Sequence, residues 1–198
     1  MHVDRGKLSK QLKADNVKII NKQNLTKFNQ DVFEVIDTEE KAYWLGFLYA
    51  DGYVGADNNI IELSLKSSDI QHLKKFKKFL EFDENKTIFC DSVRCRLNFR
   101  NKKLKNDLIK LGCTPRKSLT LTFPNSNQLP NHLLLPFTRG YVDGDGSVMI
   151  GHRNVPRLNI LGTHEFLTSL VENNGWKQNK VRYKNRDTNT GVCSTEWC

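Results

Sequence analysis

Two aspartates follow matching stretches of sequence, and no other feature of this chain suggests chemistry so directly. Residues 44–52 read WLGFLYADG, and residues 138–146 read TRGYVDGDG. Each copy is a short run with an internal glycine, and each closes with an aspartate, Asp51 or Asp145, followed by a glycine. The second aspartate follows the first by 94 residues. A duplicated acid at the end of a duplicated run predicts two half-sites that bring two carboxylates together.

The interior glycines indicate how the two copies meet. Each copy has the apolar spacing of a helix, and glycine inside a helix costs about 1 kcal/mol relative to alanine. Close approach of a second backbone is the usual reason for accepting that cost. We therefore expect the two helices to cross nearly in contact at Gly46 and Gly140. We also expect Gly52 and Gly146 to end them, as glycine commonly does after the last turn.

The predicted position of both aspartates is unfavourable for a carboxylate. The negative end of a helix dipole costs an anion roughly 0.3–1 kcal/mol, and two neighbouring carboxylates repel each other. A divalent cation between them converts both penalties into attraction, and carboxylates with main-chain carbonyls are the ligands that Mg²⁺ prefers. The pattern therefore predicts metal-assisted chemistry. A pair of ordinary Asp-Gly turns is the alternative, and the duplication of the whole pattern argues against it.

The two segments resemble the paired motifs of the LAGLIDADG homing endonuclease family, and the similarity extends over most of residues 36–198. The resemblance implies an α+β fold of two pseudo-symmetric α-β-β-α-β-β-α units that form a saddle on DNA, with the motif helices at the interface. It also implies that Asp51 and Asp145 bind the catalytic metal, Mg²⁺ or another divalent cation such as Mn²⁺. The main-chain carbonyls of Ala50 and Gly144 are expected to help.

A basic residue after the first unit, Lys117, resembles the family's basic position near the active site. A lysine there is expected to act in catalysis by stabilising the charge that develops on the phosphate. An ordinary lysine on an exposed loop is the alternative, because basic residues are common on surface connections. Both interpretations stay open at the level of sequence.

Alternating basic residues predict the surface that contacts DNA. Residues 93–100 alternate strictly between apolar and polar side chains, which predicts a half-buried strand. Residues 61–66 alternate in the same way, and residues 180–186 repeat the basic pattern. Arginine and asparagine suit phosphates and the edges of guanine and adenine, although a solvated sheet face is the alternative. The predicted DNA-binding residues are Lys66, Arg94, Arg96, Asn98, Arg100, Lys180, Arg182, Lys184 and Arg186.

The chain is expected to divide into three parts. Residues 1–35 are a basic, flexible lead-in, or at most the remnant of a helix-turn-helix. Residues 36–124 form the first unit, which closes with a helix over residues 102–111. Residues 125–198 form the second unit, which repeats the first but reaches its end without that last helix. We therefore expect the second unit to be C-terminally incomplete and looser than the first.

Composition is compatible with a nucleic-acid partner. The chain has 198 residues, a net charge of +9 and an isoelectric point of about 9.3, and strongly basic proteins commonly bind nucleic acids. Its five cysteines are an odd number, and the sequence shows no secretory signal and no membrane span. We expect reduced thiols in an intracellular monomer, cytoplasmic or organellar, without a membrane partner. Cys90 and Cys95 lie too far apart for a zinc ribbon.

Together these features predict a site-specific endonuclease that hydrolyses both strands of a double-stranded DNA target with a divalent metal. The family resemblance places such an enzyme in a mobile genetic element and gives it a role in intron homing. Two alternatives remain. One is a saddle that binds nucleic acid without cutting it, as an RNA splicing maturase or a transcription regulator. The other is a decayed, inactive homing endonuclease.

Overall fold

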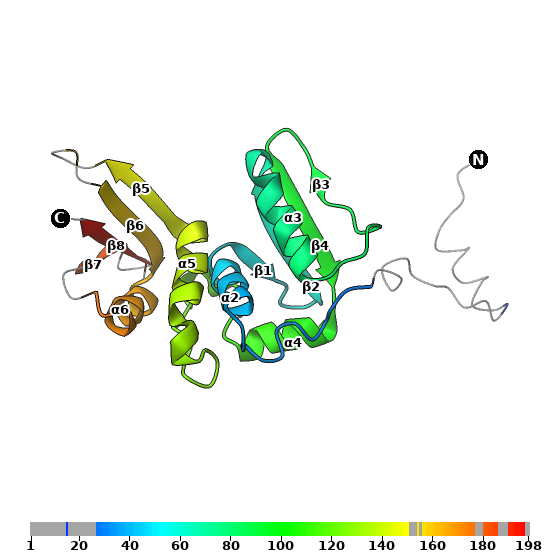
Figure 1. Cartoon of the computed structure of the whole chain (residues 1–198), viewed down its shortest axis with the longest axis horizontal. Helices are drawn as coiled ribbons and strands as arrows, with labels where there is room; N and C mark the ends of the chain where they lie inside the picture. The colour runs from blue at the N-terminus through cyan, green and yellow to red at the C-terminus, as the bar shows by residue number, and fades with distance from the viewer. Residues whose placement is uncertain are drawn as a thin grey trace.

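Figure 1 shows the computed structural model, in which a central helix pair separates two sheets. The structure describes residues 15, 27–150, 154, 156–176, 180–185 and 190–196. The central helices are α2 (Glu39–Asp51) and α5 (Leu134–Asp145), and they lie side by side. Each helix belongs to one unit, and each unit has a four-stranded antiparallel sheet.

The first unit combines one sheet with three helices. Its elements after α2 are β1 (Gly52–Val54), β2 (Ile60–Lys66), η2 (Ser67–Asp69), α3 (Ile70–Phe79), β3 (Phe89–Cys90), β4 (Arg94–Arg100) and α4 (Lys102–Lys110). The strand order is β1-β2-β4-β3. Helix α3 lies across one face of β2 and β4 (Figure 1), and its Leu73 and Phe76 are buried. That face is therefore the inner, apolar face of the sheet, and the opposite face is its outer face.

The second unit repeats the first as far as its fourth strand, β8. It contains η4 (Asn131–Leu133), α5, β5 (Gly146–Ile150), β6 (Pro156–Thr163), α6 (His164–Asn173), β7 (Lys180–Asn185) and β8 (Thr190–Glu196). The strand order β5-β6-β8-β7 matches that of the first sheet. The expected α+β fold of two related units is thus confirmed, and no described residue after α6 forms a counterpart of α4. No helix in the described ranges is long and apolar enough to cross a membrane.

Local sequence signals set the ends of the helices. The side chain of Thr38 caps α2 by accepting a hydrogen bond from Lys41 N at 3.2 Å, and Asn101 caps α4 through Leu104 N at 2.8 Å. Gly112, with a φ of 96°, follows α4 in the left-handed conformation that favours glycine after a helix. These signals fix where α2 and α4 begin and where the chain turns away from α4.

The two motif helices cross at their interior glycines. A Cβ placed on Gly46 would lie 2.0 Å from Phe137 O, and one placed on Gly140 would lie 1.9 Å from Tyr43 O. Only glycine allows this contact between backbones. Gly52 and Gly146 follow the helices as expected, but the reason is different, because their φ values of −70° and −92° are not left-handed.

The residues before α2 belong to the packed part of the first unit. Val32, Phe33 and Ile36 are buried, and the ring of Phe28 stacks on that of Phe82 at 4.6 Å. The first unit therefore begins before residue 36, where composition had placed its boundary. The rest of the predicted lead-in lies outside the described residues, apart from Asp15.

The cysteines depart from the expectation of reduced thiols. Cys90 and Cys95 form a disulfide, and β3 places them directly opposite each other in the hairpin, with their Cα atoms 4.1 Å apart. The spacing of four residues that argued against zinc is thus the length of a short hairpin turn. Cys113 is a buried, free thiol.

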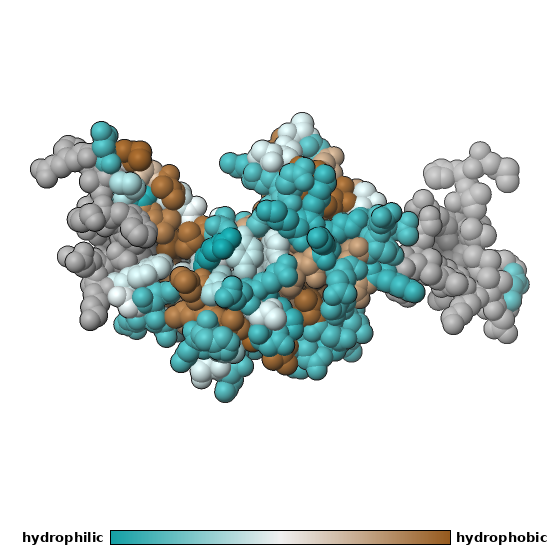
Figure 2. Space-filling model, viewed as in Figure 1, coloured by the Kyte–Doolittle hydropathy of each residue, from teal (hydrophilic) through white to brown (hydrophobic). Residues whose placement is uncertain are grey.

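The second sheet leaves apolar side chains uncovered. Val148, Met149 and Ile150 on β5 are exposed, and Figure 2 shows hydrophobic atoms gathered where Figure 1 places β5, at the upper left. No comparable group of β1 side chains is exposed, since Val54 is buried. The two units therefore share a topology but differ in how completely their inner faces are covered.

Candidate active site and nucleic-acid face

The C-terminal ends of α2 and α5 bring the two motif aspartates into one site. Asp51 is the last residue of α2, and Asp145 is the last residue of α5. A Cβ placed on Gly144 would lie 2.5 Å from the Ala50 Cβ and 3.4 Å from Asp51 Oδ2. The carboxylate of Asp51 thus lies against the residue that precedes Asp145. The close helix crossing makes this approach possible.

The electrostatics of this site disfavour two negative charges. Burial, reinforced by the neighbouring Asp51, raises the pKa of Asp145 to about 6. Burial also raises the pKa of Asp51, which the nearby Lys117 lowers in part. Two neighbouring carboxyl groups whose ionised forms are disfavoured provide a favourable environment for a cation.

The donor atoms fit an oxygen-binding metal such as Mg²⁺. No cluster of three or more His, Cys, Asp and Glu side chains that could hold a metal occurs in the described part of the chain. The candidate ligands are the two aspartates, which the helix crossing brings together, with the carbonyls of Ala50 and Gly144. Carboxylates and carbonyls without nitrogen or sulfur suit Mg²⁺, which binds one or two carboxylates and keeps several waters.

Lys117 belongs to this site and not to a solvated loop. It is only 8% exposed, and its Nζ donates a hydrogen bond to Ala50 O at 2.9 Å. It lowers the pKa of both aspartates, so its ammonium group lies within electrostatic reach of each. The 3-10 turn η3 (Lys117–Leu119) begins at this residue. The surface-loop alternative from the sequence is therefore wrong.

The outer face of the first sheet carries a row of cations. Within β4 the residues alternate as predicted, with Arg94, Arg96 and Arg100 exposed and the intervening apolar residues buried. Val93, the first residue of the predicted strand, precedes β4 and is exposed. Strand pairing places Lys66 directly opposite Arg94. Helix α3 covers the other side, and α2 contacts β1 and β2, so this row of cations faces away from α3.

Two further residues modify that face. Asn98, which we predicted to read DNA, is half-buried and donates through Nδ2 to Glu62 Oε2 at 3.4 Å. Tyr53 pairs with Glu62 across β1 and β2 and is 53% exposed, so an aromatic ring lies beside Glu62 at the β1 edge of this face. Sequence reasoning missed Tyr53, although its place before Val54, directly after the motif glycine Gly52, was a usable signal.

Comparison with solved structures identifies this architecture. The LAGLIDADG homing endonuclease I-GzeII in complex with its DNA target is similar over 78% of this chain and 78% of its own, with a TM-score of 0.52 and 11% identity. The protein has the LAGLIDADG fold. I-SmaMI bound to uncleaved DNA in the presence of calcium ions matches with a TM-score of 0.50 and 13% identity, covering 82% of this chain and 80% of that one.

The LAGLIDADG fold of this chain is also similar to the N-terminal LAGLIDADG domain of WhiA. That match covers 85% of this chain and 81% of the other, with 14% identity and a TM-score of 0.50. No family model and no curated protein sequence matches the chain. At these identities the comparisons establish the fold alone, so activity has to be argued from the site.

The remaining predicted DNA-binding residues lie in the second LAGLIDADG unit. Register places Lys180 opposite Ser194 and Arg182 opposite Val192, in rows shared with Asn159 and Leu161 on β6. An irregularity between Tyr183 and Asn185 interrupts the pairing at Lys184, so strict alternation ends there. Arg186 lies outside the described residues.

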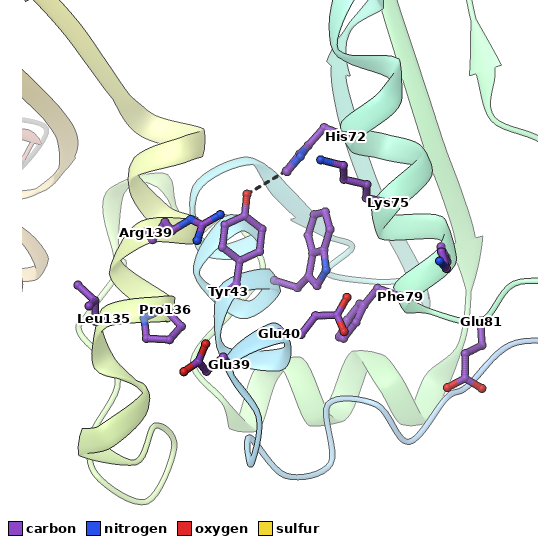
Figure 3. Close-up of a pocket in the computed structure, with 12 residues that line it drawn as sticks. Glu39, Glu40, Tyr43, His72, Lys75, Phe79, Glu81, Leu135, Pro136 and Arg139 are labelled. Atoms are coloured by element: carbon purple, nitrogen blue, oxygen red, sulfur yellow. Dashed lines mark hydrogen bonds between the residues drawn. The ribbon is translucent and has the colours of Figure 1, made fainter.

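A hollow of about 820 Å³ lies between α2, α3 and α5, on the helix side of the molecule (Figure 3). In its lining, His72 Nε2 lies 3.2 Å from the Tyr43 hydroxyl oxygen (Figure 3). The same hydroxyl donates a hydrogen bond to Asp143 Oδ2 at 2.7 Å. The guanidinium of Arg139 lies 5.4 Å from the centre of the Tyr43 ring. These contacts link α2, α3 and α5, so their role is to hold the three helices together.

Proposed function

We propose that the protein is a site-specific, double-strand DNA endonuclease of the homing type. The observation that carries this proposal is the meeting of Asp51 and Asp145, from two crossing helices, beside the buried Lys117. A structural pair of carboxylates would be a liability at two helix C-termini. A cation bound by both carboxylates would offset this cost and would act on a DNA phosphate.

The chain's own residues then have distinct roles. Asp51 and Asp145 would hold the cation, together with the carbonyls of Ala50 and Gly144. When bound, a divalent cation supplies Lewis-acid polarisation of the scissile phosphate and lowers the pKa of the attacking water. Lys117, held by Ala50 O, places its side-chain nitrogen beside the carboxylates, where it would stabilise charge developing on the phosphate.

The outer faces of the sheets would grip double-stranded DNA, and the rows of basic residues suit that task. Exposed arginines bind phosphates and can contact guanine through two hydrogen bonds. Two sheets on opposite sides of the active site would span a long target, which suits cutting at a specific site. We propose that one copy of the chain carries both half-sites and acts as a monomer.

The experiment is a cleavage assay with charge-neutral variants. Targets would first be selected from a randomised DNA library in Ca²⁺, and then incubated with the protein in Mg²⁺ or Mn²⁺. We expect linear products that EDTA prevents. Asp51→Asn and Asp145→Asn should each abolish cutting while the selected DNA is still bound. Full cutting by either variant would overturn the proposal.

A second candidate is a nucleic-acid binder that does not cut. The bond from Lys117 to Ala50 O favours it, because an ammonium group near both carboxylates offsets part of their charge without a metal. The same assay separates the two functions. Tight binding of selected DNA without cutting, in both Mg²⁺ and Mn²⁺, would support the binder.

A further inference from the structure

A cavity of about 270 Å³ adjoins the active site on the side of the first unit. It lies between the β1–β2 turn and residues 114–118, and Gly52, the residue after Asp51, is part of its wall. Its polar lining includes Tyr53, Asp57, Asn58, Arg116, Lys117 and Ser118. The cavity is therefore next to Asp51, one of the two motif aspartates.

Arg116 is the cation in this cavity that is available to a ligand. Lys117 is buried and bonded to Ala50 O, and Asn58 Oδ1 accepts a hydrogen bond from Ile60 N at 3.0 Å. Arg116 is exposed and makes no ion pair with any described residue. Asp57 is the carboxylate of the lining, so the two cations of the lining leave it a net positive charge.

The backbone at Arg116 is held in an unfavourable conformation. Its φ of 58° and ψ of 29° lie in the left-handed region, which is unfavourable for a residue with a Cβ. Glycine adopts it without that cost, and asparagine tolerates it better than arginine does. Arginine at this position is therefore unfavourable for folding, and a functional role of its guanidinium accounts for its presence.

We propose that Arg116, with the Ser118 hydroxyl, binds the DNA backbone phosphate adjacent to the scissile phosphate held at Asp51. The inference rests on the proposed function and names a contact that aligns one strand with the catalytic pair. A guanidinium suits a phosphate because its planar donors match two phosphate oxygens. Arg116 is thus a positioning residue, distinct from Lys117, which faces the carboxylates.

The test replaces Arg116 with glycine, which removes the guanidinium and relaxes the backbone. The affinity of wild type and Arg116→Gly for a short fluorescent DNA duplex would be measured over a range of salt concentrations. Loss of one phosphate contact should weaken binding and reduce the slope of log K against log[salt] by about 0.9. Thermal unfolding should show Arg116→Gly at least as stable as wild type, because the strain is gone.

Two controls make the result specific. Lys74→Ala removes one exposed positive charge from α3, on the helix side, and should leave the slope unchanged. Arg116→Lys keeps the charge and should retain most of the slope while losing the two-pronged contact. A wild-type slope in Arg116→Gly would overturn this inference and leave the proposed function standing. A wild-type protein that binds no DNA would overturn both.

Discussion

The surroundings of Asp145 disfavour the ionised form of its carboxyl group, so the stability of the fold depends on pH. Its pKa rises from 3.8 to about 6, first because it is buried and second because Asp51 lies beside it. Between these two values the folded protein binds more protons than the unfolded chain, so stability falls as pH rises. The penalty is absent below pH 3.8 and complete above pH 6.

Asp145→Asn should therefore stabilise the metal-free protein at pH 8 by about 1–3 kcal/mol and should have little effect near pH 4. Added Mg²⁺ should stabilise the wild type at pH 8 and the variant much less, because a ligand of the cation is lost. Chemical denaturation at both pH values, with and without Mg²⁺, measures this. Glu172→Gln, an exposed change on α6, is the control. Equal stability of Asp145→Asn and wild type at pH 8 would contradict the electrostatic argument.

Arg96 offers a residue-scale test of recognition. Its exposed side chain lies in the middle of the basic row on β4, beside Ser64 of β2. Arg96→Ala should weaken binding to selected DNA and relax the preference at one or two base pairs by about 1–3 kcal/mol. Repeating the library selection with the variant reads out both effects. If affinity and base preferences are unchanged, this face is an ordinary solvated surface.

At the scale of elements, the α2–α5 crossing decides whether the two carboxylates meet. Gly46→Ala and Gly140→Ala would each place a methyl group about 2 Å from a carbonyl oxygen of the other helix. Because backbone atoms cannot move aside cheaply, each change should cost about 3 kcal/mol and push the helices apart. Cleavage should then fall more than DNA binding does.

Gly175→Ala is the matched comparison for that prediction. No atom lies within 4 Å of a Cβ at Gly175, so its cost should be limited to its left-handed φ of 68°, about 1–2 kcal/mol. Urea denaturation compares the stability of the three variants, and a cleavage assay tests whether the active site still functions. Equal destabilisation by all three would show that the glycines in α2 and α5 are not needed for close contact.

The same elements show what the sequence could predict. Helices and strands were predictable because their periodicity is local, and the crossing was predictable because a glycine recurs at the same place in both copies. The bond from Lys117 to Ala50, the Asn98–Glu62 pair and the packing of residues 27–36 were not predictable. Each joins segments far apart in the chain, and no local pattern records which distant partner a side chain will find.

At the scale of the whole molecule, the two units differ in one matched pair of valines. Val54 and Val148 occupy matching positions in the two units, because each lies two residues after the glycine that follows its motif helix. Val54 pairs with Ile61 in the first sheet, and Val148 pairs with Leu158 in the second. Val54 is 4% exposed, whereas Val148 is 75% exposed. In the first unit, α4 lies close to the β1–β2 turn, where Lys105 Nζ donates to Asn58 O at 2.7 Å. The described part of the second unit supplies no such helix.

This pair predicts unequal stability of the two halves. Val54→Ala should destabilise the protein by on the order of 2 kcal/mol, because it removes buried methyl groups and leaves a cavity. Val148→Ala should change stability by less than about 0.5 kcal/mol, as surface changes usually do.

In hydrogen exchange of the unmodified chain, amides of β5 and β6 should exchange faster than those of β1 and β2, because less apolar packing opposes local opening. Equal protection of the two hairpins, with a large cost for Val148→Ala, would mean that another segment or a partner covers the second sheet in solution.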